Sequence, residues 1–286
     1  MENVLIVTNF SAGRRLAVKY KKLVLDFVLK QAKNFKFVDI DEFKVVDVSD
    51  FDTILVMGGD GTVNKVLPCL VNTNKVLGII PCGTANLLAA KLNIPTNVDK
   101  SLNIINANNI KKIDVLKVNE RFCILRCGFG YDSDIICKTP QSLKNKFGYL
   151  AYFIAGIIFA LRLKYKKYFL TIDNEEHTID ATNIIVGNAS NMYKNLVSVG
   201  KNSKLDDGLM DIFILKTSNP IIFFIEFLMI IFNIKFNDKY VEYIQAKTVQ
   251  LKTEWQNCHI DGEKNNFSED MNISIYKNCL NVFANK

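Results

Sequence analysis

The sequence lacks an apolar run long enough to cross a membrane as a helix. Two stretches come nearest to that length, Tyr149–Leu161 and Pro220–Phe232, but each holds only thirteen residues and the second contains Glu226. Thirteen helical residues reach about 20 Å, whereas the hydrocarbon core of a bilayer measures roughly 30 Å. The N-terminal residues also lack a basic leader and pass directly into a strand-like segment. We therefore expect neither a membrane span nor a signal peptide.

Cysteine and histidine are too few and too scattered for a disulfide framework or a zinc site. The seven cysteines are odd in number and follow no regular spacing, which favours a reducing compartment and thus the cytoplasm. The closest pair, Cys123 and Cys127, lies in a strand-like segment, and the chain has only two histidines, His177 and His259, to complete a metal site. We expect no metal bound through cysteine.

The content of charged residues is moderate, and the net charge of the chain is positive. Charged residues make up 23% and hydrophobic residues 49% of the chain, which is typical of a folded protein and excludes a disordered one. The formal net charge of +7 is compatible with a nucleotide, a nucleic acid or an anionic membrane surface as partner. No basic-aromatic stripe or recognisable nucleic-acid module is present, so we expect no nucleic acid partner.

The first part of the chain alternates strand and helix patterns. Buried strands are predicted at Val4–Val7, Phe35–Ile40, Thr53–Met57 and Val76–Ile80, and helices at Arg15–Lys33, Val63–Val71 and Leu87–Leu92. This alternation predicts an α/β domain with a parallel sheet. Ligands of such sheets bind beyond the carboxyl ends of the strands.

Three polar turns, Asn9–Gly13, Gly58–Asn64 and Pro81–Asn86, follow predicted strands at that edge. Glycine lets a ligand approach the backbone N–H groups closely, which suits an anion such as phosphate. Asp60 would repel a bare phosphate, so Mg²⁺ with a nucleotide is the first ligand to consider. The alternative is a set of tight turns with helix caps.

From Ile113 onward the chain consists mainly of short segments rich in β-branched and aromatic residues. Seven such segments predict a β-sandwich or curled sheet: Asp114–Val118, Arg121–Cys127, Tyr168–Asp173, His177–Val186, Leu209–Leu215, Ala246–Thr253 and Asn272–Tyr276. We place an α/β nucleotide-binding domain at residues 1–112 and a β-rich domain at residues 113–278. Residues 279–286 are a candidate strand of the first domain.

Asp261 and Glu263 are two carboxylates separated by a single glycine. In a strand they would share one face, and in a turn Gly262 would let both point into a cleft. Attack of an alcohol on a γ-phosphate needs a base for the hydroxyl proton and Mg²⁺ on the phosphates, so one carboxylate suits each task. The alternative is an acidic hairpin turn.

The three turns together resemble the diacylglycerol kinase catalytic-domain family, which includes soluble bacterial lipid kinases and the sphingosine and ceramide kinases, and is more distantly related to NAD kinases. Further segments follow the family's order: Arg126–Asp132, Phe147–Tyr152, Val186–Asn188, Lys204–Asp211 and Ile260–Glu263. The chain departs from the pattern at Lys65, where many members carry Glu, and at Leu87, where many carry Asp. The second helix of the family's first domain also looks abbreviated here.

The resemblance implies an active site in a cleft between a nucleotide-binding domain and a mostly β domain. It implies that Glu263 accepts the proton and that Asp261 binds metal or positions the site. A structural Mg²⁺ site away from the chemistry is implied at Asp207, completed by the carbonyls of Lys204 and Leu209. The implied ATP-binding residues are Asn9, Ser11, Gly13, Gly58, Gly59, Asp60, Gly61, Thr62, Asn64, Gly83, Thr84 and Asn86.

We therefore expect a cytoplasmic, peripherally membrane-associated kinase that transfers the γ-phosphate of ATP to a lipid hydroxyl, such as that of diacylglycerol. The run Tyr149–Leu161, with Lys144, Lys146, Lys164, Lys166 and Lys167 around it, could lie on an anionic membrane or be a buried core helix. The enzyme alternative is an NAD kinase, and the non-catalytic alternative is a nucleotide- or lipid-binding regulator. The sequence identifies no single lipid acceptor and leaves a homodimer open.

Overall fold

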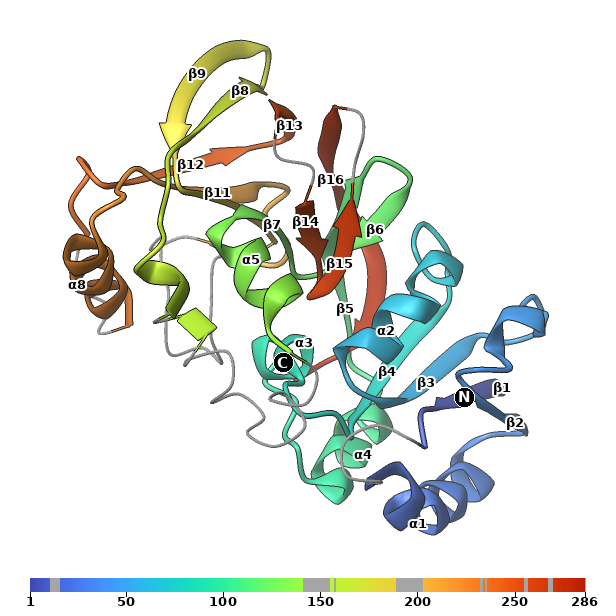
Figure 1. Ribbon diagram of the computed structural model, residues 1–286. Coiled ribbons are helices and arrows are strands. Elements are labelled where there is room, and N and C mark those ends of the chain that lie inside the picture. The colour runs from blue at the N-terminus through green and yellow to red at the C-terminus, as the bar shows by residue number, and fades with distance from the viewer. Residues whose placement is uncertain are drawn as a thin grey trace. The chain divides into compact units, whose positions relative to one another are not determined.

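The computed structural model describes residues 1–10, 16–140, 155–156, 158–188, 203–231, 234, 236–254, 257–266 and 270–285 (Figure 1). The chain divides into two compact units, one formed by Met1–Asp114 with Asn278–Lys286 and the other by Val115–Lys277. The division falls next to the boundaries that the composition suggested, and the C-terminal residues belong to the first unit.

The first unit is built on a parallel sheet. Its strands β1 (Asn3–Thr8), β2 (Asn34–Asp39), β3 (Thr53–Gly58) and β4 (Val76–Pro81) run in the order β2-β1-β3-β4. The end of β16 (Met271–Phe283) adds a further parallel strand beside β4, with Asn281 opposite Val76. The four strands predicted for this part of the chain, and the parallel sheet, are confirmed.

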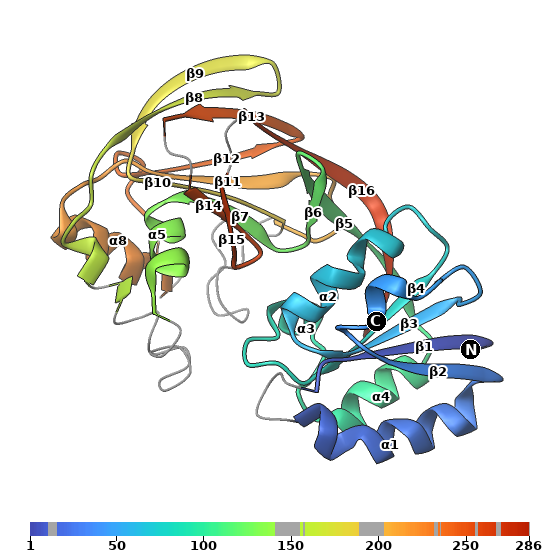
Figure 2. The same ribbon diagram turned by 45° about the vertical axis from the view of Figure 1, so that its right-hand side comes forward.

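Helices cover both faces of this sheet. Figure 2 shows α1 (Leu16–Gln31) and α4 (Val98–Asn106) on one face and α2 (Asp60–Val66) and α3 (Leu87–Lys91) on the other. Ala17, Val24 and Val28 of α1 pack against buried residues of the strands. The abbreviated second helix is confirmed, because the only helical turn between β2 and β3 is a short 3-10 helix (Phe43–Val45). A second 3-10 helix (Leu67–Cys69) follows α2 directly.

The second unit consists of two antiparallel layers of strands that enclose an apolar core (Figure 2). One layer has the order β12-β11-β10-β7-β14-β15, and in the other β13 lies between β8 and β16. Besides β16, the strands are β5 (Ile110–Val118), whose residues up to Asp114 belong to the first unit, and β6 (Arg121–Cys123), β7 (Arg126–Gly130), β8 (Lys166–Ile172), β9 (Glu175–Ala181), β10 (Asn183–Gly187), β11 (Met210–Leu215), β12 (Val241–Ala246), β13 (Thr248–Thr253), β14 (Asn257–Ile260) and β15 (Glu263–Asn266). The predicted β-sandwich-like domain is confirmed.

Several boundaries in this unit differ from the sequence prediction. The segment Arg121–Cys127 is not one strand but β6 and β7, because the backbone N–H groups between them bond to Asp261 instead of a neighbouring strand. The segment His177–Val186 is likewise divided, at Thr182, whose hydroxyl donates to the carbonyl of Thr217. Conversely, the predicted strand Asn272–Tyr276 and the candidate strand at residues 279–286 contribute to one long strand, β16, which ends at Phe283.

The second unit also contains helices. Helix α5 (Tyr131–Lys138), which the sequence patterns did not reveal, lies beside the β14–β15 hairpin in both views (Figures 1 and 2). Helix α8 (Pro220–Ile231) coincides with the second apolar run. Of the first run, residues 149–154 and 157 lie outside the described residues, and the others are helical up to Ala160. Within the described ranges, no helix is long and apolar enough to cross a membrane.

Candidate active site

The glycine turns after β3 and β4 lie against each other at the carboxyl edge of the parallel sheet. Gly58 is in register with Pro81, so both turns begin at the same level. A Cβ atom at Gly83 would lie 2.4 Å from the Cα atom of Gly59, and one at Gly59 would lie 3.0 Å from the Cα atom of Gly83. Only glycine at both positions permits this contact. Of the three turns predicted to lie at one edge of the sheet, the second and the third are confirmed to meet there.

Side chains from both turns stabilise this contact. Asn86 adopts a left-handed backbone conformation with φ of 51°, and its amide both accepts from the N–H of Gly83 and donates to the carbonyl of Gly83, each at 2.9 Å. The Asp60 carboxylate accepts from the N–H groups of Leu87 at 3.0 Å and Leu88 at 3.1 Å. Asp60 thus joins the first glycine turn to the first residues of α3.

The remaining predicted nucleotide-binding residues differ in how exposed they are. Asn9 follows β1 at the same edge and donates its N–H to the carbonyl of Met57 at 3.2 Å. Thr62 is buried, Gly61 and Thr84 are exposed, and Ser11 and Gly13 lie outside the described residues. The side-chain oxygen of Asn64 is buried and has no hydrogen-bond partner within the described part of the chain. A buried acceptor without a donor fits a bound polar ligand or water.

The Asp261-Gly262 pair forms the two-residue turn of the β14–β15 hairpin. Both residues have positive φ, 49° and 84°, as a type I′ turn requires, and Ile260 pairs with Glu263 across it. The backbone here is therefore that of an acidic hairpin turn. Glu263 is exposed at the start of β15, where its carboxylate can meet a hydroxyl group.

Asp261 is held by backbone N–H groups of the connection between β6 and β7. Its carboxylate accepts hydrogen bonds from Ile124 and Leu125, both at 2.8 Å, from Arg126 at 2.9 Å, and from the Cys123 thiol at 3.3 Å. Of the two roles that the resemblance implied for Asp261, this geometry favours positioning over metal binding. The residue fixes the hairpin turn, and with it the start of β15.

A cluster of three side chains, His259, Asp132 and Arg126, adjoins this turn. Sequence reasoning did not predict it. The His259 Nε2 atom lies 2.6 Å from an oxygen of Asp132, whose other oxygen is 3.2 Å from the Arg126 guanidinium. Burial would raise the pKa of Asp132, but Arg126 and His259 outweigh it and hold that pKa at about 2. The carboxylate is therefore ionised. No local pattern connects His259 to Asp132, since 127 positions separate them in the sequence.

At the predicted Mg²⁺ site, the Asp207 carboxylate accepts hydrogen bonds from backbone N–H groups of its own turn. One oxygen of Asp207 accepts from the N–H of Lys204 at 3.1 Å and the other from the N–H of Leu209 at 2.9 Å. Each carboxylate oxygen has a second lone pair, so Asp207 still fits a hard cation. Burial raises the pKa of nearby Asp211, and the negative charge of Asp207 raises it further. Within the described ranges, no group of three or more histidine, cysteine, aspartate or glutamate side chains could hold a metal ion.

None of the seven cysteines, all of which lie within the described residues, forms a disulfide bond. Cys82 lies in the turn after β4, where burial raises the pKa of its thiol to about 11. Burial also raises the pKa values of Cys123 and Cys127 well above the ordinary range. These thiols are neutral at physiological pH and suit neither nucleophilic chemistry nor metal binding.

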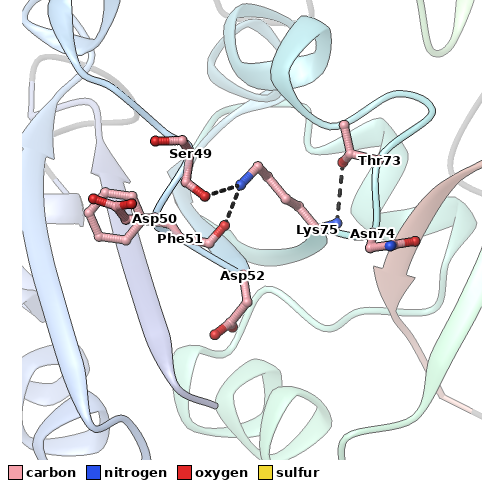
Figure 3. Close-up of a pocket in the computed structure, with 7 residues that line it drawn as sticks. All are labelled: Ser49, Asp50, Phe51, Asp52, Thr73, Asn74 and Lys75. Atoms are coloured by element: carbon pink, nitrogen blue, oxygen red, sulfur yellow. Dashed lines mark hydrogen bonds between the residues drawn. The ribbon is translucent and has the colours of Figure 1, made fainter.

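One cavity lies away from all of these groups, at the amino ends of β3 and β4. It measures about 330 Å³ and is lined by Ser49–Asp52 and Thr73–Lys75 (Figure 3). The Lys75 amine inside it already donates to the carbonyls of Val48 at 2.7 Å, Ser49 at 3.1 Å and Phe51 at 2.5 Å. This lysine closes the loop before β3, and the cavity has no part in the site at the opposite edge of the sheet.

Comparisons with known proteins give two family matches. Residues 3–118 match the family described as the diacylglycerol kinase catalytic domain. Residues 126–284 match the family described as the YegS C-terminal NAD kinase beta sandwich-like domain.

Individual relatives agree with these matches. The chain is 27% identical over 230 residues to a protein named diacylglycerol kinase from Bacillus subtilis, covering 79% of this chain and 76% of that protein. It is 34% identical over 142 residues to a probable lipid kinase YegS-like protein from Citrobacter koseri, covering 48% of each. The matched region thus spans about half the length of the Citrobacter protein, and only 37% of another relative, from Synechocystis.

Among solved structures, one described as a putative diacylglycerol kinase from Bacillus anthracis superposes with a TM-score of 0.81 at 23% identity. The superposition covers 99% of this chain and 95% of that structure. At this identity the likeness establishes a shared fold.

Proposed function

The chain belongs to the diacylglycerol kinase catalytic-domain family, with a YegS-type second domain, and from this we propose that it is an ATP:lipid phosphotransferase. The acceptor is the hydroxyl group of a membrane lipid, with diacylglycerol or a related lipid alcohol as the first candidates. The names of the relatives support a kinase acting on lipid.

The observation that carries the ATP half of the proposal is the contact between Gly59 and Gly83. Two glycine turns meet at the edge of a parallel sheet where phosphates bind in this fold class, and neither turn can carry a side chain at the contact. The unpartnered side-chain oxygen of Asn64 lies on α2, the helix that follows the first turn. We assign ATP to this edge and propose as its binding residues Asn9, Ser11, Gly13, Gly58–Thr62, Asn64, Gly83, Thr84 and Asn86, of which Ser11 and Gly13 lie outside the described residues.

The chemistry assigned to Glu263 is that of a general base. Its exposed carboxylate takes the proton of the lipid hydroxyl, while the hydroxyl oxygen forms a bond to the γ-phosphorus of ATP and the bond to the β-phosphate oxygen breaks, releasing ADP. Asp261 holds the turn that presents Glu263. Mg²⁺, when bound, supplies positive charge against the phosphates, and we assign a second, structural Mg²⁺ to Asp207 with the carbonyls of Lys204 and Leu209.

The proposed place of action is the cytoplasmic membrane surface. Helix α8 exposes Ile221, Phe224 and Ile225, with 71% of Ile221 accessible. Tyr131 links α8 to the neighbouring helical segment, since its ring packs on Phe223 and its hydroxyl donates to the carbonyl of Gly156 at 2.5 Å. That segment exposes Ile158 and Leu161 and is followed by Arg162, Lys164 and Lys167, which are also exposed. An apolar surface bordered by cations suits an anionic bilayer.

A turnover assay tests the proposal. The purified chain is incubated with γ-labelled ATP, Mg²⁺ and vesicles that each contain one lipid alcohol, and ADP release and lipid labelling are measured. We expect labelling of at least one lipid and its loss in Glu263→Gln. NAD without vesicles forms a parallel arm, and labelling of NAD instead of lipid would identify an NAD kinase. ATP binding without turnover in any arm would leave a nucleotide-binding regulator as the function.

A further inference from the structure

His259 is a fully buried imidazole whose two nitrogens have different partners. Its Nε2 atom lies 2.6 Å from Asp132, and its Nδ1 atom accepts a hydrogen bond from the backbone N–H of Gly262 at 3.3 Å. Gly262 is the second residue of the hairpin turn and immediately precedes Glu263. The imidazole is therefore one hydrogen bond away from the turn that carries the proposed base.

These partners define the position of the imidazole proton. A nitrogen that accepts a hydrogen bond carries no proton, so the contact with Gly262 leaves Nδ1 bare and places the imidazole proton on Nε2. From Nε2 it donates to the Asp132 carboxylate, which stays ionised because Arg126 is paired with its other oxygen. A carboxylate behind an imidazole selects the tautomer and fixes the ring plane.

The rest of the surroundings leave the ring little freedom. A Cβ atom at Gly128 would lie 2.4 Å from His259 Nε2 and 2.6 Å from an oxygen of Asp132, so the backbone of β7 covers both groups. The N–H of Asp132 donates to the side-chain oxygen of Asn183 at 2.9 Å, which anchors the start of α5 to β10. The carboxylate and the ring are thus held by separate elements of the same unit.

Hydrogen bonds of two adjacent residues, Asp261 and Gly262, therefore hold the hairpin turn in place. The Asp261 carboxylate bonds to the backbone after β6, and the Gly262 N–H bonds to His259. The Gly262 position itself is uncrowded, since a Cβ atom there would meet nothing within 4 Å. No side chain packs where a Cβ atom of Gly262 would lie, so the hydrogen bond from its N–H to His259 is a direct restraint on this residue, beside the bonds of Asp261 and the pairing of β14 with β15.

We propose that His259, oriented by Asp132 and Arg126, is a positioning residue for Glu263. By accepting the Gly262 N–H, the imidazole sets the direction in which β15 starts and hence the direction of the Glu263 carboxylate. The proposal rests on the proposed function in that Glu263 is taken as the base. Misplacing a base by an ångström costs up to about 100-fold in rate, so a loss of roughly 10- to 100-fold is expected on removal of the imidazole.

The first test is the tautomer in the unaltered chain. The chain has two histidines, so ¹⁵N spectra of uniformly labelled protein contain two imidazole pairs, and His177→Gln assigns them. We expect a protonated Nε2 and a bare Nδ1 for His259 near pH 7.5. A proton on Nδ1 would overturn the proposal without any measurement of activity.

The second test is kinetic and uses His259→Gln. We expect kcat to fall about 10- to 100-fold with the KM for ATP unchanged, whereas His177→Gln on β9 leaves both unchanged. Because both changes act through one group, the double variant His259→Gln with Glu263→Gln should be no slower than Glu263→Gln alone. An unchanged kcat in folded His259→Gln, or multiplicative losses in the double variant, would overturn the positioning role. If His259→Gln does not fold, the tautomer in the unaltered chain decides.

These outcomes separate the two proposals. A wild-type chain that labels no lipid contradicts the proposed function, whatever the spectra show. A wild-type chain that labels lipid, together with a His259→Gln variant of full activity, contradicts only the inference about His259.

Discussion

The Asp60 carboxylate accepts the backbone N–H of Leu87, at 3.0 Å, across the contact between the two glycine turns. It accepts the N–H of Leu88 as well, at 3.1 Å, so one side chain satisfies two of the unpaired N–H groups at the start of α3. These bonds explain why an acid directly after Gly58 and Gly59 is compatible with the fold: the carboxylate is directed at backbone donors. At Leu87, where the chain departs from the pattern of the family, the contact uses the backbone and is independent of the side chain.

Replacing Asp60 by asparagine measures what its hydrogen bonds to α3 contribute to stability and to ATP binding. We expect Asp60→Asn to lower the free energy of unfolding by about 1–2 kcal/mol, because an amide oxygen can replace only one of the two charge-assisted bonds. The affinity for ATP should fall in parallel, since the two turns lose their connection. Chemical denaturation and an ATP titration measure the two effects. Asp99→Asn, an exposed acid in the first turn of α4, is the matched control and should change both by far less.

The contact between Gly59 and Gly83 predicts a large effect of one added methyl group. In Gly83→Ala the new Cβ atom would lie 2.4 Å from the Gly59 Cα atom, so the two turns must separate. We expect ATP binding to be lost and stability to fall by about 1–3 kcal/mol. Gly156→Ala, where the nearest atom is at 3.3 Å on a helical segment, should bind ATP normally. Equal ATP affinity in the two variants would contradict the assignment of this edge to the nucleotide.

Glu263 offers the most direct prediction about catalysis. Glu263→Gln keeps the size of the side chain but removes the base, so kcat should fall at least 100-fold with the KM for ATP unchanged. Initial rates of ADP release at varied ATP measure both constants. Glu176→Gln, an exposed acid on β9, should match the wild-type rate. A kcat of Glu263→Gln within a few-fold of wild type would show that another group takes the proton.

The low pKa of Asp132 predicts a definite dependence of stability on pH. Its folded pKa of about 2 lies below the ordinary value of 3.8, so the ionised carboxylate stabilises the fold fully above about pH 4, and this contribution is lost as pH falls towards 2. The difference corresponds to about 2 kcal/mol. We expect the stability difference between wild type and Asp132→Asn, measured by urea unfolding, to narrow by about this amount between pH 5 and pH 2. A difference that stays constant over this interval would contradict the ion pair.

The apolar surface of α8 predicts a selective loss of membrane binding. Ile221→Glu adds a charge at an exposed position, so stability should not change, but binding to vesicles rich in anionic lipid should weaken at least 10-fold. Cosedimentation with vesicles measures the binding. Val45→Glu, at a position 88% exposed in the first unit, should bind vesicles like the wild type. Equal binding of both variants would mean that α8 does not meet the membrane.

Local patterns in the sequence predicted the four strands of the first unit and the glycine turns after β3 and β4, although they did not predict α4. The runs Val4–Val7 and Ile54–Met57 are apolar on both faces, as is typical of strands in a buried parallel sheet. Glycine at positions 59 and 83 allows a close approach of two backbones. Parallel strands place their carboxyl ends at one edge, so the convergence of the turns followed from the order of strands and helices alone.

The arrangement around Glu263 was decided only by the tertiary structure. Asp261 bonds to Ile124, which is 137 positions away, and His259 to Asp132, which is 127 positions away. Such pairs depend on the strand order β10-β7-β14-β15 and on the register between β7 and β14, and the short polar strands β14 and β15 carry no hydrophobic period that would reveal them. The sequence by itself determined that an acidic pair lies beside a glycine. The register of the sheet decided that one acid holds the turn and that a buried imidazole supports it, because hydrogen bonds between distant segments form only after the strands that carry them have paired.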